Sequence, residues 1–242
     1  MASLLYVGVR PELDAATAER ASFRIALGLP SDELDRIDLV TAALPEDAFD
    51  RYDGFVIGGS PFNVTDTAKS DTQRRVEADL ERIAARALDG GPAAFFTCFG
   101  IGVVTRLLGG TVTTRHPEEA SAAEIRATSA AAADPLFGPA GASFAAFTAH
   151  KEGSTDVPGD AVLLAANDAC PVQAYRVGSR LYATQFHPEP SPQDFADRMV
   201  FYRTTGYFDP EAFDTVQETV LRSAVTEPAR ILGRFADLVS PH

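Results

Sequence analysis

The chain has 242 residues, of which 45% are hydrophobic and 23% charged, and this composition fits an ordinary globular protein of one large α/β domain or two small ones. The 34 acidic and 21 basic residues give a formal net charge of −13 at pH 7, and such a surface repels phosphate backbones and anionic lipid heads, which argues against nucleic acids and membranes as partners. No apolar stretch approaches the roughly 20 residues of a membrane helix, and the apolar run at 3–9 is too short for a secretion signal, so we expect a cytoplasmic protein.

The N-terminal part of the chain alternates between predicted strands and helices. Apolar runs predict buried strands, and apolar residues that recur every three or four positions predict helices. The strands are expected at 3–9, 36–41, 52–57 and 93–97, and the helices at 15–27, 72–88 and 100–108. Such alternation is typical of a mostly parallel sheet with helices on both faces.

The pattern changes after residue 110, where short strand-like runs predominate until helices return near the C-terminus. We expect these strands at 111–115, 124–128, 144–148, 161–165, 172–177 and 181–186, with short helix at 130–133 and longer helices at 212–222 and 228–239. Gly178 and Ser179 lie where the last two strands would form a hairpin. No linker divides the chain, so we expect one domain over 1–242, with 194–242 as a helical C-terminal extension.

Cys98 directly follows the predicted strand 93–97 and precedes a predicted helix. A cysteine on such a turn is exposed at the edge of the sheet, and the free N–H groups of the helix lower its pKa and can bind an oxyanion. A second interpretation stays open from position alone, because free cysteine is often simply a small buried residue. Cys170 is expected to be structural, and in a reducing compartment the two cysteines are not expected to pair.

His187 ends the predicted strand 181–186 and is followed by Pro188 and Glu189. Residues two apart in extended chain point to the same side, so the Glu189 carboxylate can orient the imidazole and stabilise its charged form. A lone histidine at a strand end would more often be structural. Together with Cys98, however, this pair forms a candidate catalytic triad.

The pair Gly58-Gly59 follows the predicted strand 52–57, whose neighbour in a parallel sheet could be the strand before Cys98. Two glycines let the backbone come close to a bound group and direct an N–H toward it. An ordinary turn explains the same pair equally well. His150, beside Lys151 and Glu152, likewise fits either a substrate site or a plain loop.

Three segments resemble the class I glutamine amidotransferase family, and within it the amidotransferase domain of GMP synthase. They are YDGFVIGGSP at 52–61, FFTCFGIG at 95–102 and YATQFHPE at 182–189, and the segment at 149–168 is also similar to this family. The resemblance implies a flavodoxin-like sheet with helices on both faces and a few antiparallel strands. It also implies site residues: Cys98 as nucleophile, His187 as base and acid, Glu189 as its partner, Gly59 and Phe99 as oxyanion donors, and Gly58, Ser60, Gly102 and His150 around the substrate.

The resemblance further implies an activity. Cys98 would attack a glutamine or γ-glutamyl amide, form a γ-glutamyl thioester, and release ammonia and then glutamate, with no metal or organic cofactor. The ammonia would pass to a synthetase subunit. The family usually has glutamine where this chain has Gly102, and a pocket widened for a bulkier acyl or amine group is one explanation of this difference. A free-standing γ-glutamyl hydrolase or peptidase is therefore an alternative, and a non-catalytic binding protein, which would not need the whole triad, is a second one.

Overall fold

The computed structural model describes residues 3–30 and 33–240, and within these ranges nine strands form one sheet. Five of them run parallel, in the order β2 (Leu34–Asp38), β1 (Leu4–Gly8), β3 (Gly54–Ile57), β4 (Ala93–Thr97) and β11 (Leu181–Thr184). An antiparallel half continues from β11 through β10 (Ala174–Val177), β9 (Val162–Ala166), β6 (Glu118–Ala127) and β7 (Ser143–His150). The predicted α/β fold with its flavodoxin-like, mostly parallel sheet and a few antiparallel strands is confirmed.

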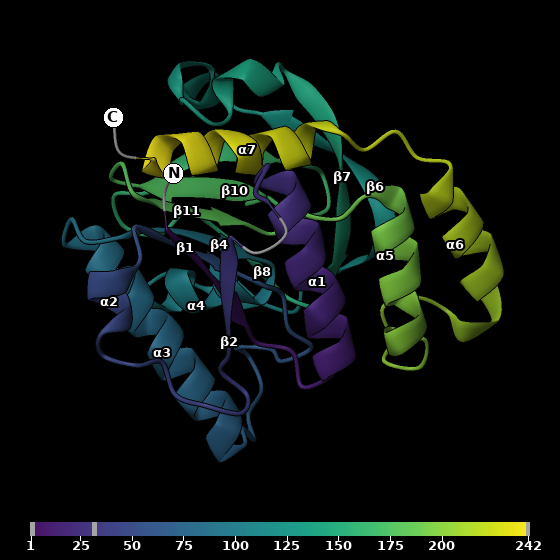
Figure 1. Cartoon of the computed structure of the whole chain (residues 1–242). Helices are drawn as coiled ribbons and strands as arrows, with labels where there is room; N and C mark the ends of the chain where they lie inside the picture. Colours follow the sequence, from purple (N-terminus) through teal and green to yellow (C-terminus); the bar gives the residue numbers. More distant parts are fainter. Residues whose placement is uncertain (1–2, 31–32, 241–242) are drawn as a thin grey trace.

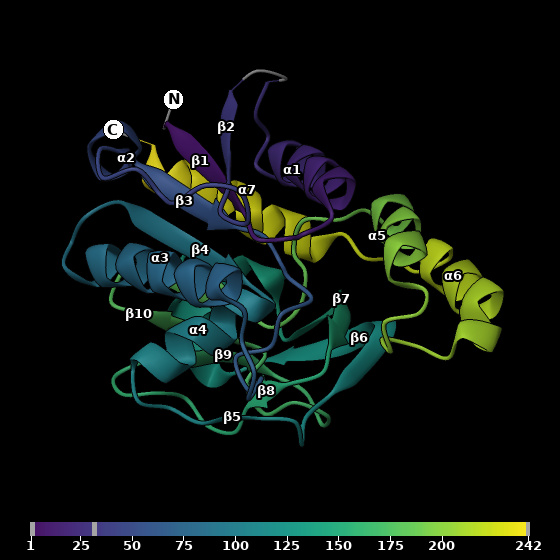
Figure 2. The same cartoon turned by 90° about the horizontal axis from the view of Figure 1, so that it is seen from below.

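Helices cover both faces of the parallel half, because its strands are apolar on both sides (Figures 1 and 2). On one face α3 (Asp71–Leu88) and α4 (Phe99–Leu107) pack against Leu5, Val7 and their neighbours. On the other face α1 (Leu13–Ala26) and α7 (Glu227–Val239) pack against Leu4, Tyr6 and their neighbours. Successive side chains of β1 therefore point into two separate apolar layers, one on each face of the sheet.

Several predicted boundaries differ from the structure. Strand β2 begins two residues and ends three residues before the predicted 36–41, and β6 begins six residues before the predicted 124–128 because it pairs along most of β7. The predicted strand 111–115 shortens to β5 (Val112–Thr113), which pairs with the unpredicted β8 (Gly153–Ser154) outside the main sheet. The predicted helix 130–133 is a 3₁₀ helix, and the short α2 (Ala48–Arg51) was not predicted.

The C-terminal helices take part in the core. Phe235 of α7 packs against Phe95 of β4 with ring centroids 5.4 Å apart. Phe195 of α5 (Pro192–Met199) stacks on Phe147 of β7 at 4.5 Å, and α6 (Phe213–Leu221) joins the same cluster. Because these contacts tie the segment to the sheet, we propose that the chain is a single domain and not a domain with an appended extension.

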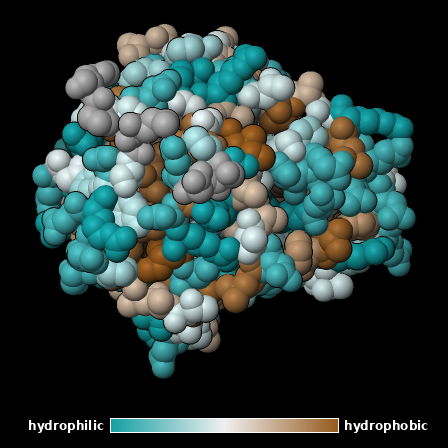
Figure 3. Space-filling view, viewed as in Figure 1, coloured by the Kyte–Doolittle hydropathy of each residue, from teal (hydrophilic) through white to brown (hydrophobic). Residues whose placement is uncertain are grey.

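The surface in Figure 3 is mainly hydrophilic, with apolar side chains in separated areas. In the part of the chain that the structure describes, no helix is long and apolar enough to cross a membrane. Both cysteines, Cys98 and Cys170, are free and buried.

Candidate active site

Cys98 occupies the sharp turn between β4 and α4. Its backbone φ is 51° and ψ is −106°, and it is the one residue other than glycine with positive φ in residues 3–30 and 33–240. Such a conformation costs on the order of 1–3 kcal/mol and persists only where the surrounding structure enforces it. Here the Cys98 N–H donates to Thr184 O at 2.8 Å, which ties the turn to the neighbouring strand β11. The same strained turn presents the nucleophile in α/β hydrolases.

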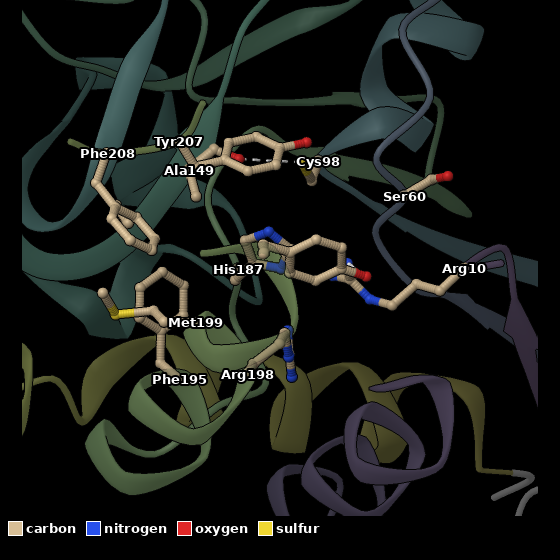
Figure 4. A pocket seen from close by; sticks show the side chains of 12 residues that line it. Arg10, Ser60, Cys98, Ala149, His187, Phe195, Arg198, Met199, Tyr207 and Phe208 are labelled. Carbon is tan, nitrogen blue, oxygen red and sulfur yellow. Dashed lines mark hydrogen bonds between the residues drawn. The ribbon is translucent and has the colours of Figure 1, made fainter. Parts of the chain in front are cut away.

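His187 and Glu189 lie just beyond the end of β11, the strand paired in parallel with β4. The His187 N–H donates to Phe147 O at 2.8 Å, which fixes the backbone of the histidine against β7. Its Nδ1 faces Glu189 Oε1 at 3.3 Å. Cys98 and His187 also line one cavity (Figure 4). Since Glu189 contacts the far side of the same imidazole, the structure brings the three predicted triad residues together.

The imidazole of His187 is held in its charged form. Burial lowers its pKa, but the charges of Glu189 and Cys98 outweigh burial and raise the pKa to about 9. For the Glu189 carboxyl, burial raises the pKa, but Arg198 and His187 outweigh it and hold this pKa below its ordinary range. The electrostatics of the site therefore favour a charged histidine between a carboxylate and the sulfur.

A buried ionic network behind the triad was not predicted from the sequence. Arg198 of α5 donates to Glu189 Oε1 and, at 3.2 Å, to Glu19 Oε1 of α1. Glu19 also accepts from Arg10 Nη2 at 2.7 Å and from Tyr6 Oη at 2.8 Å. One signal was present in the sequence, because Glu19 falls on the buried apolar stripe of its helix. A carboxylate at such a position needs a partner.

Gly58 and Gly59 lie against this network. A Cβ on Gly58 would come within 2.1 Å of Glu19 Oε2, and one on Gly59 within 2.7 Å of His187 Cε1, so neither position accepts a side chain. The Gly59 N–H donates to Glu19 Oε1 at 3.2 Å. The role of the Gly59 N–H as an oxyanion donor stays a prediction, and it requires the N–H to leave Glu19 and donate to the substrate oxygen instead. The Phe99 N–H lies in the first turn of α4, next to Cys98.

Cys98 lies between two small cavities of different character. The first, of about 40 Å³, is mainly apolar and aromatic, and includes His187 and Arg198 (Figure 4). The second, of about 10 Å³, is more polar, and includes all four of the other predicted positions that line a cavity: Ser60, Phe99, Gly102 and His150. Ser60 and Tyr207 line both cavities beside Cys98. Of the other predicted residues, Phe99, Gly102 and His150 line the polar cavity only, and the general acid His187 lines the apolar cavity only.

The position of Gly102 does not widen the second cavity. A Cβ there would meet Val64 Cγ2 at 3.2 Å and Glu152 Oε1 at 3.4 Å, so neighbouring side chains already occupy the space. The Glu152 carboxylate accepts from the Val64 and Thr65 N–H groups at 2.8 and 3.0 Å and fixes that loop over the cavity. The structure therefore does not support a pocket widened at this position, because the room next to Gly102 is taken by a loop held through Glu152.

A second cysteine, histidine and glutamate also lie together. Ligand atoms of Glu118, His150 and Cys170 lie within 4.8 Å of one another, as do those of Glu19, His187 and Glu189, and either group could in principle hold a metal ion. Glu118, however, already accepts from His150 Nε2 at 2.8 Å and from two amide side chains. Burial raises the pKa of the Cys170 thiol to about 12, so it is a poor nucleophile. In the other group, Arg10 and Arg198 already neutralise the carboxylates.

Known proteins resemble this chain in sequence and in fold. A family model described as Glutamine amidotransferase class-I matches residues 33–205. The chain is 29% identical over 138 residues to the glutamine-hydrolysing GMP synthase of Aliivibrio salmonicida, which covers 57% of this chain but 24% of that protein. It is 28% identical over 174 residues to gamma-glutamyl peptidase 3 of Arabidopsis thaliana, covering 69% of this chain and 67% of that protein. The crystal structure of a glutamine amidotransferase from Thermotoga maritima matches with a TM-score of 0.76 over 100% of both chains at 16% identity, which is a likeness of fold.

Proposed function

This chain belongs to the class-I glutamine amidotransferase family, and from that premise we propose that it is a cysteine-dependent hydrolase that cleaves γ-glutamyl amide bonds, including that of glutamine, through a γ-glutamyl thioester. One observation supports this most directly. The strained Cys98 turn lies beside an imidazole that Glu189 and Cys98 hold charged, with a pKa of about 9. A protein that only binds a ligand has no need of this arrangement.

In the proposed reaction the Cys98 sulfur attacks the γ-carbonyl carbon, so that an S–C bond forms and the carbonyl oxygen becomes an oxyanion. The C–N bond then breaks while His187 gives its proton to the leaving nitrogen, which leaves a γ-glutamyl thioester and a free amine or ammonia. Water, losing a proton to His187, attacks the thioester and releases glutamate and the Cys98 sulfur, which leaves His187 protonated as at the start. Glu189 keeps the imidazole oriented and stabilises its charge throughout.

The oxyanion needs donors that already point to where charge develops. The Phe99 N–H, at the start of α4, supplies one of them and adds the favourable end of the helix dipole. The Gly59 N–H supplies a second donor once substrate draws it away from Glu19. Ser60, Gly102 and His150 then surround the γ-glutamyl part in the polar cavity, where Glu152 and Lys151 offer charges of both signs.

The fate of the released amine separates two versions of this function. In the first version the chain hydrolyses the bond by itself, as the name of gamma-glutamyl peptidase 3 indicates for that protein, which this chain matches over 67% of its length. GMP synthase matches over 24% of its length, which leaves open a version in which a synthetase subunit receives the ammonia. We favour hydrolysis by the chain itself, because that reaction needs only the residues at this site.

The test is interception of the thioester. The protein is incubated with glutamine and with γ-glutamyl methylamide, and glutamate release is measured with and without hydroxylamine. Formation of γ-glutamyl hydroxamate at the expense of glutamate supports a thioester. Release of glutamate that hydroxylamine cannot divert would contradict the covalent intermediate. If added synthetases raise the rate of glutamine hydrolysis, the amidotransferase version gains support.

The rate is expected to depend on pH through His187. Its pKa lies at about 9, above its ordinary value, so the imidazolium is present below pH 9 and is lost as the pH rises through that value. Since this proton goes to the leaving nitrogen, kcat/KM should fall above about pH 9. In Glu189→Gln the main charge that raises this pKa is gone, and the decline should begin at lower pH. A decline at the same pH in both proteins would show that another group is responsible.

A further inference from the structure

The two cavities beside Cys98 are lined by residues with different roles in the proposed reaction. His187, the group that gives a proton to the leaving nitrogen, lines the apolar cavity and not the polar one. Phe99 and Gly102 line the polar cavity and not the apolar one. If the reaction proceeds as proposed above, the acyl part lies on the polar side and the amine leaves toward the apolar side.

The apolar cavity is built mainly from large side chains. Its walls come from α5, from the following chain and from two alanines of the sheet, and the apolar and aromatic members are Ala120, Ala149, Phe195, Met199, Tyr202, Tyr207 and Phe208. Figure 4 shows Phe195, Met199 and Phe208 gathered on one side of His187, with Ser60 and Arg10 on the other. Ammonia, the leaving group of glutamine, is small and polar and gains nothing from such walls.

In this structure the apolar cavity is partly enclosed. Its volume of about 40 Å³ exceeds the roughly 10–15 Å³ that one buried water molecule needs, but it is small for a bulky group. Tyr207 and Phe208 close it from the loop at 203–209, which is attached through the Ala120 N–H to Tyr207 O at 2.9 Å and through Lys151 to Thr205 O. Met199, with its flexible thioether, forms another part of the wall. We therefore expect a bulky amine group to enter only with a shift of this loop and a rotamer change of Met199.

From these contacts we infer that the apolar cavity is a leaving-group subsite, and that the enzyme prefers γ-glutamyl amides whose amine part carries an aromatic or bulky apolar group over glutamine. This inference rests on the proposed function. Apolar walls select by size, and one methylene in such a pocket changes kcat/KM by about 10–200-fold. The amine part of the substrate is thus selected by α5, the chain that follows it and two alanines of the sheet, and the γ-glutamyl part by the polar cavity.

The experiment measures kcat/KM of the full chain for glutamine and for γ-glutamyl methylamide, isoamylamide and phenethylamide, followed by glutamate release. We expect the phenethylamide to exceed the methylamide by about tenfold or more. Equal or lower values for the bulky amides, with glutamine and the methylamide hydrolysed, would overturn the subsite and leave the proposed function intact. No release from any of the four would reject the proposed function and the subsite with it.

A variant that fills the cavity provides an independent check. Ala120 is buried in β6 and lines the cavity, whereas the next residue, Ser121, is exposed. Ala120→Leu should reduce the phenethylamide to methylamide ratio of kcat/KM toward one, and the matched control Ser121→Leu should keep the wild-type ratio. An unchanged ratio in folded Ala120→Leu would overturn the assignment. If Ala120→Leu does not fold, the wild-type substrate series and the smaller Ala120→Val decide the matter.

Discussion

Replacing Cys98 with alanine should reduce glutamate release from glutamine and from γ-glutamyl amides by about 10⁴-fold or more, the scale seen when a triad nucleophile is removed. The reason is that, among the described residues that line the cavity with His187, Cys98 alone carries the thiol that a thioester needs, and the remaining site supplies binding and oxyanion stabilisation. Initial rates at saturating substrate, together with hydroxylamine trapping, measure the loss. The fold should survive, because alanine removes one sulfur atom from a side chain that is 7% exposed.

Cys170 provides the matched control for this experiment. It is also a buried free cysteine, and it has its own histidine and glutamate neighbours in His150 and Glu118. Burial raises the pKa of its thiol to about 12, so it stays protonated at neutral pH. Cys170→Ala should therefore retain activity within a few-fold of wild type. The opposite result, with Cys98→Ala active and Cys170→Ala inactive, would move the catalytic site to the second cluster.

Replacing Glu19 with alanine should lower the free energy of unfolding by about 3–5 kcal/mol, the usual cost of removing one partner of a buried ion pair. The Glu19 carboxylate is 0% exposed and accepts hydrogen bonds from Arg10, Arg198, Tyr6 and the Gly59 N–H. Without it two guanidinium groups stay buried with less compensation. Urea unfolding of the wild type and the variant measures the difference.

The control for Glu19 comes from the same helix. Asp14 lies in the first turn of α1 and is exposed, so Asp14→Ala should change the free energy of unfolding by less than about 1 kcal/mol. Equal losses in the two variants would mean that the helix, and not the buried network, determines the effect. Activity should also fall in Glu19→Ala, because Arg198 links Glu19 to the Glu189 carboxylate that orients His187.

Much of the parallel half of the sheet could be predicted from local pattern. Strands β1, β3 and β4 and helices α3 and α4 lie within two residues of their predicted bounds, because each is specified by its own apolar run or stripe. Pairing was harder to predict. The extent of β6 depends on its register with β7, and the short β5 and β8 exist only because they meet each other. Such pairings are decided by segments far apart in the chain.

The candidate site likewise has features that could be predicted from neighbouring residues and features that depend on contacts between distant segments. The sequence by itself determined the Cys98 turn and the His187–Glu189 pair, because both depend on residues that are neighbours along the chain. Only the tertiary structure decided that β4 lies beside β11, that Arg198 reaches Glu19 across 179 positions, and that Val64 and Glu152 fill the space next to Gly102. The physical reason is that charge compensation and cavity shape arise from groups that share a buried volume, and sheet order, not sequence spacing, determines which groups share it.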